Sequence, residues 1–212
     1  MAHDDFAFEP VPGLPGPLPK GETILWQGRP STWQLALEAF GLRWVIGYFA
    51  LIVAWRAGVG AADAGLAGAL AFGIPYVMLG MAGVLVVLAL AWAQARGAVY
   101  TITTARVLMR VGAALSVTFN IPFKQVANAR LDLRRDGTGT IALETQGDTR
   151  IAYLVCWPHV RPWYLKQTQP ALRCIPDAAR VAAILADAAE TRLSQPEVRR
   201  EADTGAAMMA AE

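Results

Sequence analysis

The sequence predicts a membrane α-helical hairpin of two transmembrane helices, joined to an α+β domain in which an antiparallel β-sandwich or open barrel is capped by a C-terminal helix. Three observations support this prediction. The 212 residues are 55% hydrophobic and only 17% charged, whereas soluble domains average about 25% charged residues. Residues 44–93 contain two charged side chains, Arg56 and Asp63. From residue 96 onward the apolar period shortens to about two, which is typical of strands.

Residues 1–20 contain five prolines, and we expect an extended arm because proline breaks both helix and sheet. In residues 21–43 we expect a short strand, from Glu22 to Gly28, and then an amphipathic helix. Ser31 and Gln34 have the spacing of a capping box at the start of that helix. Its apolar stripe would lie along the membrane surface before the chain enters the bilayer. The stripe consists of Trp33, Leu37, Phe40 and Trp44.

The apolar segment 44–93 is long enough for two membrane-spanning helices and a tight turn, at about 1.5 Å per residue and a hydrocarbon thickness of roughly 30 Å. We expect the first span at about 44–62 and the second at about 66–92. Arg56 lies late in the first span, where it would extend to the head groups or pair with Asp63. Pro75 is expected to kink the second span.

Basic residues flank the two spans, and the turn between them has none. Lys and Arg near the ends of spans mark the cytoplasmic side. We therefore expect a multi-pass membrane protein with both termini in the cytoplasm. The flanking residues are Lys20, Arg29, Arg43, Arg96, Arg106 and Arg110.

Small residues recur every four positions along both spans, and such rows allow the backbones of two helices to approach closely. The first row is Ala50, Ala54 and Gly58, and the second is Gly65, Ala69 and Gly73. We expect the two rows to face each other within the hairpin. The alternative is that one row meets the helix of another protein or of a second copy in a homodimer.

Residues 96–193 are expected to form a cytoplasmic β domain. Alternating apolar residues run from Val99 to Ile121, continue at Leu131 and Leu133, and resume at 141–155 after a hairpin turn at 135–139. A closing helix follows Pro176, with one apolar face. Residues 194–212 are charged and alanine-rich, and we expect a flexible tail.

The loop at 156–174 combines prolines, aromatic rings and cations, a composition that is favoured at protein interfaces and at membrane interfaces. We assign a candidate partner-binding site to part of it. The alternative is that its tryptophans close the open end of the sheet as local core. The candidate residues are Trp157, Pro158, His159, Arg161, Trp163 and Tyr164.

No catalytic, metal or cofactor site is predicted. Neither of the two histidines, His3 and His159, has a nearby set of Cys, His, Asp or Glu at ligand spacing. Neither phosphate-loop nor nucleophile-elbow motifs occur, and the spans have no His to ligate a pigment metal. A net charge of +2 is too small for a nucleic-acid-binding protein. Cys156 and Cys174 have no redox-motif spacing and are expected to be ordinary thiols.

A family resemblance is carried by ETILWQGRPS before the spans and by VYTITTARVLMRVG and TFNIPFKQVANARL after them. This arrangement resembles the bacterial pleckstrin-homology-like (PH-like) membrane proteins. The segments EPVPGLPGPLPKGETILWQGRP and YLVCWPHVRPWYLKQTQPALRCIPDAARVAAIL resemble the PuhB family of photosynthetic-complex assembly proteins. Together these segments cover most of residues 9–190.

The resemblance implies a PH-like fold for residues 96–193 and a role in assembling the photosynthetic reaction centre and its core light-harvesting antenna. It implies reaction-centre or core-antenna subunits as partners, in a photosynthetic intracytoplasmic membrane. From the residues themselves, a membrane-anchored lipid-binding or scaffolding module stays open as the alternative, with membrane lipids as the partner. The cations that would support lipid binding are Arg106, Arg110, Lys124, Arg130, Arg134 and Arg135.

Overall fold

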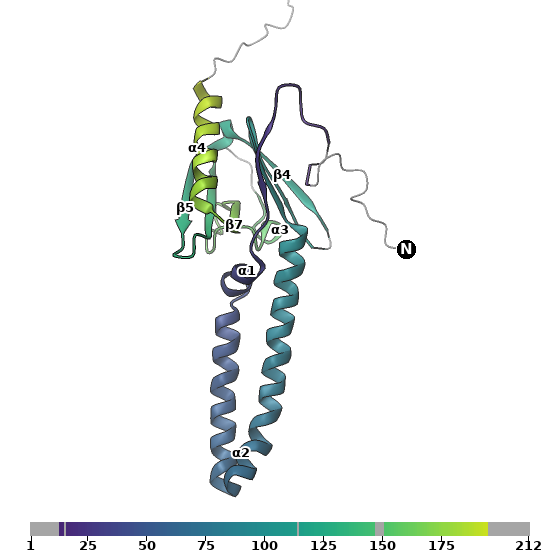
Figure 1. Ribbon diagram of the computed structural model, residues 1–212, viewed down its shortest axis with the longest axis vertical. Helices are drawn as coiled ribbons and strands as arrows, with labels where there is room; N and C mark the ends of the chain where they lie inside the picture. The colour runs from purple at the N-terminus through teal and green to yellow at the C-terminus, as the bar shows by residue number, and fades with distance from the viewer. Residues whose placement is uncertain (1–12, 15, 114, 147–150, 195–212) are drawn as a thin grey trace, which may run out of the picture.

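A computed structural model describes residues 13–14, 16–113, 115–146 and 151–194 (Figure 1). It has a β domain with a long helical hairpin extending from one end. The elements are β1 (Ile24–Gly28), α1 (Thr32–Glu38), α2 (Leu42–Gly97), β2 (Val99–Thr103), β3 (Arg106–Val111), β4 (Val117–Pro122), the 3-10 turn η1 (Phe123–Gln125), β5 (Val126–Leu133), β6 (Gly139–Thr145), α3 (Tyr153–Cys156), β7 (Ala171–Ile175) and α4 (Ala178–Ser194).

The strands form two antiparallel sheets, one in the order β1-β2-β3-β4 and the other in the order β5-β6-β7. The core lies between the sheets and the apolar face of α4, which buries Val181, Leu185 and Ala188. The expected closing helix therefore forms, and its face packs as the sequence predicts.

Strand β1 precedes the hairpin in sequence but belongs to the sheet that follows it. Trp26 pairs with Ile102 of β2, and Glu22, just before β1, accepts two hydrogen bonds from the Arg106 guanidinium at 2.9 and 2.8 Å. The hairpin is thus an insertion between two neighbouring strands. Sequence reasoning found this strand but placed it in a separate segment, because its pairing partner lies more than 70 residues away.

Helix α2 runs from Leu42 to Gly97 and reverses direction near its middle (Figure 1). Ala64 (φ −141°, ψ 23°) and Gly65 (φ 61°, ψ −142°) are the non-helical residues inside it, so residues 42–63 form a first arm and residues 66–97 a second. Pro75 lies inside the second arm, where the backbone angles stay helical, and the kink expected there stays a prediction. The reversal falls at Gly65 because glycine adopts positive φ without steric cost.

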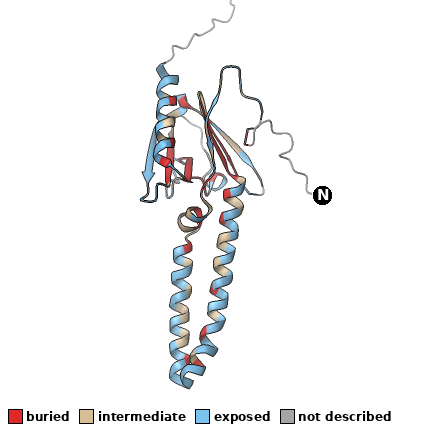
Figure 2. Cartoon of the chain, in the orientation of Figure 1, coloured by how far each residue is buried: buried red, intermediate tan, exposed pale blue. Residues whose placement is uncertain are grey.

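Length and composition qualify α2 as one candidate membrane helix. Only 11% of its most apolar window is buried within the described chain, whereas a core helix of a soluble protein would be mostly covered. Figure 2 shows both arms largely exposed. That each arm crosses a membrane stays a prediction.

The segment before α2 differs from the expected amphipathic helix. Helix α1 ends at Glu38, and Gly41 (φ 64°) separates it from α2, so the apolar stripe is interrupted. Ser31 occupies the N-cap position without a side-chain capping bond, and the Gln34 amide donates to Asp136 instead. Leu35 and Ala36 are the buried residues of α1, while Trp33 stays exposed.

Two further expectations in the second half of the chain are wrong. Residues 153–156 form the short helix α3 where a strand was expected, and the preceding residues 147–150 lie outside the described part of the chain. The end of the supposed loop, Ala171–Ile175, is the fully buried strand β7. The sequence did not predict β7 because Arg173, a charged residue, occupies a buried position in it, next to the buried thiol of Cys174.

Candidate functional site

The segment from Cys156 to Pro170 divides into a buried base and an exposed tip. At the base, Pro158, His159 and Val160 are buried. The tip is held by an isolated bridge between Val160 and Pro170 and by the Arg161 N–H, which donates to the Gln169 carbonyl at 2.9 Å. The six predicted partner-binding residues are therefore close in sequence but do not share one surface.

Pro158 and His159 must be removed from the candidate surface because they are core residues. The His159 side chain is fully buried, and its Nδ1 lies 2.6 Å from the Tyr100 hydroxyl. The Tyr100 oxygen also accepts the Arg173 backbone N–H at 3.4 Å, and the Pro158 carbonyl accepts a hydrogen bond from Arg173 Nη1 at 3.1 Å. Both residues therefore belong to the buried base of the segment.

Burial sets the titration of this polar core. It lowers the pKa of His159 to about 3, with a smaller contribution from the positive charge of Arg173, so the imidazole is neutral at physiological pH. Burial also raises the pKa of Cys156 to about 12 and the pKa of Cys174 to about 11. Both thiols are therefore protonated and poorly nucleophilic, in agreement with the prediction of ordinary cysteines.

Trp157 is neither fully buried like the base of the segment nor fully exposed like its tip. Its ring packs edge-to-face on Phe40, with centroids 5.2 Å apart. Phe40 in turn packs against Leu42 of the first arm and Ala91 of the second arm, near the end of the hairpin that joins the β domain. The side chain remains 40% exposed. Trp157 therefore joins the loop to the base of the hairpin and offers a partner only part of its ring.

The exposed tip retains Arg161, Trp163 and Tyr164. The Arg161 guanidinium lies over the Tyr164 ring, 4.0 Å from its centroid, and also donates to the Gln169 side chain at 3.0 Å. Trp163 is 90% exposed and has a φ of 69°, a conformation that is rare for bulky residues and clusters at binding sites. An ordered cation beside an exposed tryptophan is the kind of anchor that protein interfaces use.

The two predicted rows of small residues do not face each other: the first row is exposed, and only part of the second row packs. A Cβ at Gly58 would meet nothing within 4 Å, and Ala50 and Ala54 are exposed. Gly65 lies at the reversal, and Ala69 is half-buried. Of the six residues, Gly73 packs most closely: a Cβ there would lie 3.3 Å from Ala57 Cβ.

The closest contact of the two arms uses glycines that neither predicted row contained. A Cβ on Gly60 would lie 2.2 Å from the Gly68 carbonyl oxygen, and a Cβ on Gly68 would lie 2.0 Å from the Gly60 oxygen. Gly80 similarly receives the Phe49 side chain. Spacing alone could not identify these pairs because several glycine and alanine rows run along both arms, and the position of the reversal selects which of them meet.

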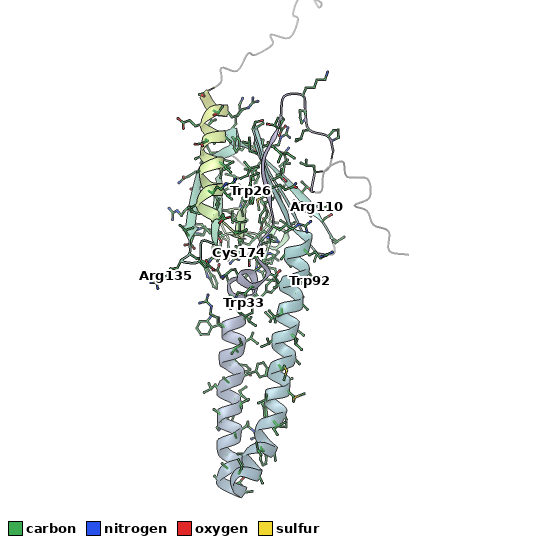
Figure 3. The ribbon with its side chains drawn as sticks, viewed as in Figure 1. Trp26, Trp33, Trp92, Arg110, Arg135 and Cys174 are labelled. Carbon is green, nitrogen blue, oxygen red and sulfur yellow. The ribbon has the colours of Figure 1, made fainter. Side chains whose placement is uncertain are left out.

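The cations that would support lipid binding are dispersed and partly neutralised. Arg106 pairs with Glu22, and Arg134 pairs with Glu38. Arg110 and Arg135 lie on opposite sides of the β domain (Figure 3). Arg110 is 6% exposed, while Arg130 and Arg135 lie on and after β5 in the other sheet. Within the described residues no group of three or more His, Cys, Asp or Glu side chains could hold a metal ion.

Comparison with known proteins gives two matches. Residues 40–189 match the family model of the bacterial PH domain. The chain is also 48% identical, over the full length of both proteins, to a Rhodobacter capsulatus protein described as an uncharacterized 23.7 kDa protein in the puhA 5′ region. No solved structure matches the chain. Strand β1 lies outside the residues that the family model matches.

Proposed function

Because this chain belongs to the bacterial PH domain family, we propose that it is a non-enzymatic, integral-membrane assembly factor for the bacterial photosynthetic reaction centre and core light-harvesting complex. In this role both arms of α2 span the photosynthetic intracytoplasmic membrane, and the β domain holds a subunit of the complex on the cytoplasmic side. The relative named for the puhA 5′ region supports a photosynthetic setting, as does the resemblance to the PuhB family.

The observation that carries the proposal is the exposed tip at Arg161, Trp163 and Tyr164. Trp163 leaves 90% of its surface exposed, although burying a tryptophan is strongly favourable. Its loop is held by backbone hydrogen bonds at its base, so a partner would not have to order it. Such pre-organisation lowers the entropic cost of binding.

Protein binding is preferred over a lipid-binding or scaffolding module because two of the candidate arginines already have carboxylate partners. A phosphate would have to compete with Glu22 and Glu38 for them. An enzymatic role has little support, since the low pKa of the buried His159 makes it a weak base and the two buried thiols stay protonated.

The proposal is tested with the double variant Arg161→Ala/Trp163→Ala in a phototrophic host. Removing an aromatic anchor from the centre of an interface costs about 2 kcal/mol or more, roughly thirtyfold in affinity. The yield of assembled complex, measured from the absorbance of the membranes, should fall. The variant protein should remain in the membrane fraction, with an unchanged circular dichroism spectrum.

Leu115→Ala is the matched control, because Leu115 is equally exposed, at 86%, on a different loop, and should leave assembly unchanged. Normal assembly in a folded double variant would contradict the proposal. Loss of the β-sheet signal in the double variant would instead show that Trp163 contributes to the core.

A further inference from the structure

Arg56 is the one charged side chain of the first arm that faces the second arm. Its guanidinium lies over the Phe72 and Tyr76 rings, 5.1 and 5.6 Å from their centroids. Its Nε is buried and has no hydrogen-bond partner among the described residues. No carboxylate lies within ion-pair distance in that part of the chain, and Asp63, the expected partner, is not paired with it.

The depth of the guanidinium follows from the rings that it contacts. Phe72 and Tyr76 come 8 and 12 positions after Ala64, the first non-helical residue of the reversal. At about 1.5 Å per residue, the charge therefore lies roughly 12–18 Å from the closed end of the hairpin. The Cα–Cβ bond of Arg56 tilts toward the start of its helix, so the side chain points away from the nearer membrane surface. This geometry argues against the expected extension to the head groups.

In a hydrocarbon core about 30 Å thick, that position is close to the centre. A cation there is costly and is normally paired, and the two aromatic rings supply only a weak counterpart to its charge. The rings contact the planar guanidinium, but no oxygen among the described residues accepts a hydrogen bond from its Nε. A carboxylate is its natural partner, because two parallel N–H···O bonds match the shape of both groups.

We propose that Arg56 is a recognition site for a transmembrane helix of a partner protein that carries an Asp or Glu near the middle of the membrane. A lipid phosphate at the surface is too distant, and backbone at this depth must be helical, so a helix is the element that can deliver the carboxylate. The Arg56 side chain is half-buried, and Phe72 beside it is 41% exposed, so the site can be reached from the side of the hairpin. The inference rests on the proposed membrane insertion and adds the chemistry of the partner.

The test uses the full chain, labelled at its C-terminus, in bilayers of zwitterionic lipid. The probe is a synthetic leucine–alanine transmembrane peptide with one Asp at its centre. Matched peptides carry Asn at the centre, or Asp at one end. Energy transfer should show binding of the central-Asp peptide at least about tenfold tighter than binding of either matched peptide.

The variant Arg56→Gln should abolish this preference, and Arg56→Lys should keep part of it, since a lysine keeps the charge but not the planar pair of donors. Arg96→Gln is the control and should keep the full preference. Arg96 also lies over an aromatic ring, that of Trp92 at 5.6 Å, but it is in the last turn of the second arm, next to the β domain. Equal binding of the Asp and Asn peptides, or a preference that survives Arg56→Gln, would overturn the inference. So would loss of the preference when phosphatidylglycerol is added, because a lipid head group would then be the occupant.

This result can be separated from that of the proposed function. The variant Arg161→Ala/Trp163→Ala should retain the preference for the central-Asp peptide. If Arg56→Gln loses that preference while the folded Arg161→Ala/Trp163→Ala variant assembles complexes normally, the Arg56 site stands but the proposed assembly function fails. If complexes fail to assemble with Arg161→Ala/Trp163→Ala, while the unmodified chain binds the central-Asp and matched peptides equally well, the assembly role stands and the Arg56 site fails.

Discussion

At the scale of single residues, burial changes the meaning of the most suggestive side chains. His159 belongs by sequence to an aromatic and basic loop, yet it is fully buried beside Tyr100 and Arg173. Its Nε2 has no partner among the described residues. A neutral imidazole tolerates this position because desolvation penalises only its charged form.

His159 predicts how stability depends on pH. Its folded pKa, about 3, lies below the ordinary value of 6.5, so the unfolded chain binds the proton first as the pH falls. Stability should therefore be unaffected by this group above pH 6.5 and should fall from there toward pH 3, by at most about 1.4 kcal/mol per pH unit. Denaturation of the full chain in detergent measures the slope.

The variant His159→Asn, whose side chain is polar but does not titrate, gives the comparison for that slope. Carboxylates titrate over the lower part of the same range in both proteins, so the difference between the two slopes isolates the histidine. Identical slopes between pH 6.5 and 4.5 would show that His159 is accessible to protons in the folded protein.

At the scale of elements, short contacts join the hairpin to the β domain. Glu38, at the end of α1, pairs with Arg134 and lies 3.9 Å from Arg173 of β7. The Ser31 N–H donates to the Cys174 carbonyl at 2.8 Å. Helix α1 is therefore held to the second sheet at both of its ends.

Replacing Glu38 by Gln should weaken this junction. The change leaves Arg134 and Arg173, both largely buried, without their carboxylate. Because Glu38 itself is only partly buried, the free energy of unfolding should fall by about 1–3 kcal/mol. The melting temperature should fall, and proteolysis between α1 and α2 should become faster. Glu190→Gln, on the exposed side of α4, is the control and should change neither.

The glycine contacts predict which substitutions separate the two arms. Gly60→Leu should destabilise the hairpin by about 1–3 kcal/mol, the usual cost of overpacking, because its side chain would collide with the Gly68 backbone. Gly58→Leu has open space around it and should stay within about 0.5 kcal/mol. Steric trapping or unfolding in detergent measures both.

A destabilising Gly58→Leu would indicate that the row containing Ala50, Ala54 and Gly58 does pack within the hairpin. If Gly58→Leu leaves the hairpin intact but reduces self-association in bilayers, the same row instead meets a second copy, which is the alternative that the sequence left open.

At the scale of the whole molecule, the charges agree with one orientation. The basic residues that flank the hairpin lie at its open end, with the β domain, whereas Asp63 lies beside the reversal. The described N-terminal residues and the end of α4 both belong to the β-domain end (Figure 1). Both termini are thus expected on the cytoplasmic side.

Reporter fusions test this topology directly. A fusion at the C-terminus should report the cytoplasm, and an insertion at Asp63 should report the periplasm. A cytoplasmic signal at both sites would mean that the hairpin does not cross the membrane, and a periplasmic C-terminus would invert the orientation.

The sequence alone determined the features that depend on local composition and period: an apolar segment long enough for two helical arms, a strand-rich domain after it, and a closing helix with one apolar face. These follow because each segment must bury its own apolar residues at the period of its own backbone. Only the tertiary structure decided that β1 joins β2 across the hairpin, that Ala171–Ile175 is a core strand, and that Gly60 meets Gly68. It also decided that His159 is buried while Trp163 is exposed. The spacing of apolar residues shows that a segment has an apolar face. Which element packs against that face depends on contacts between segments far apart in the chain.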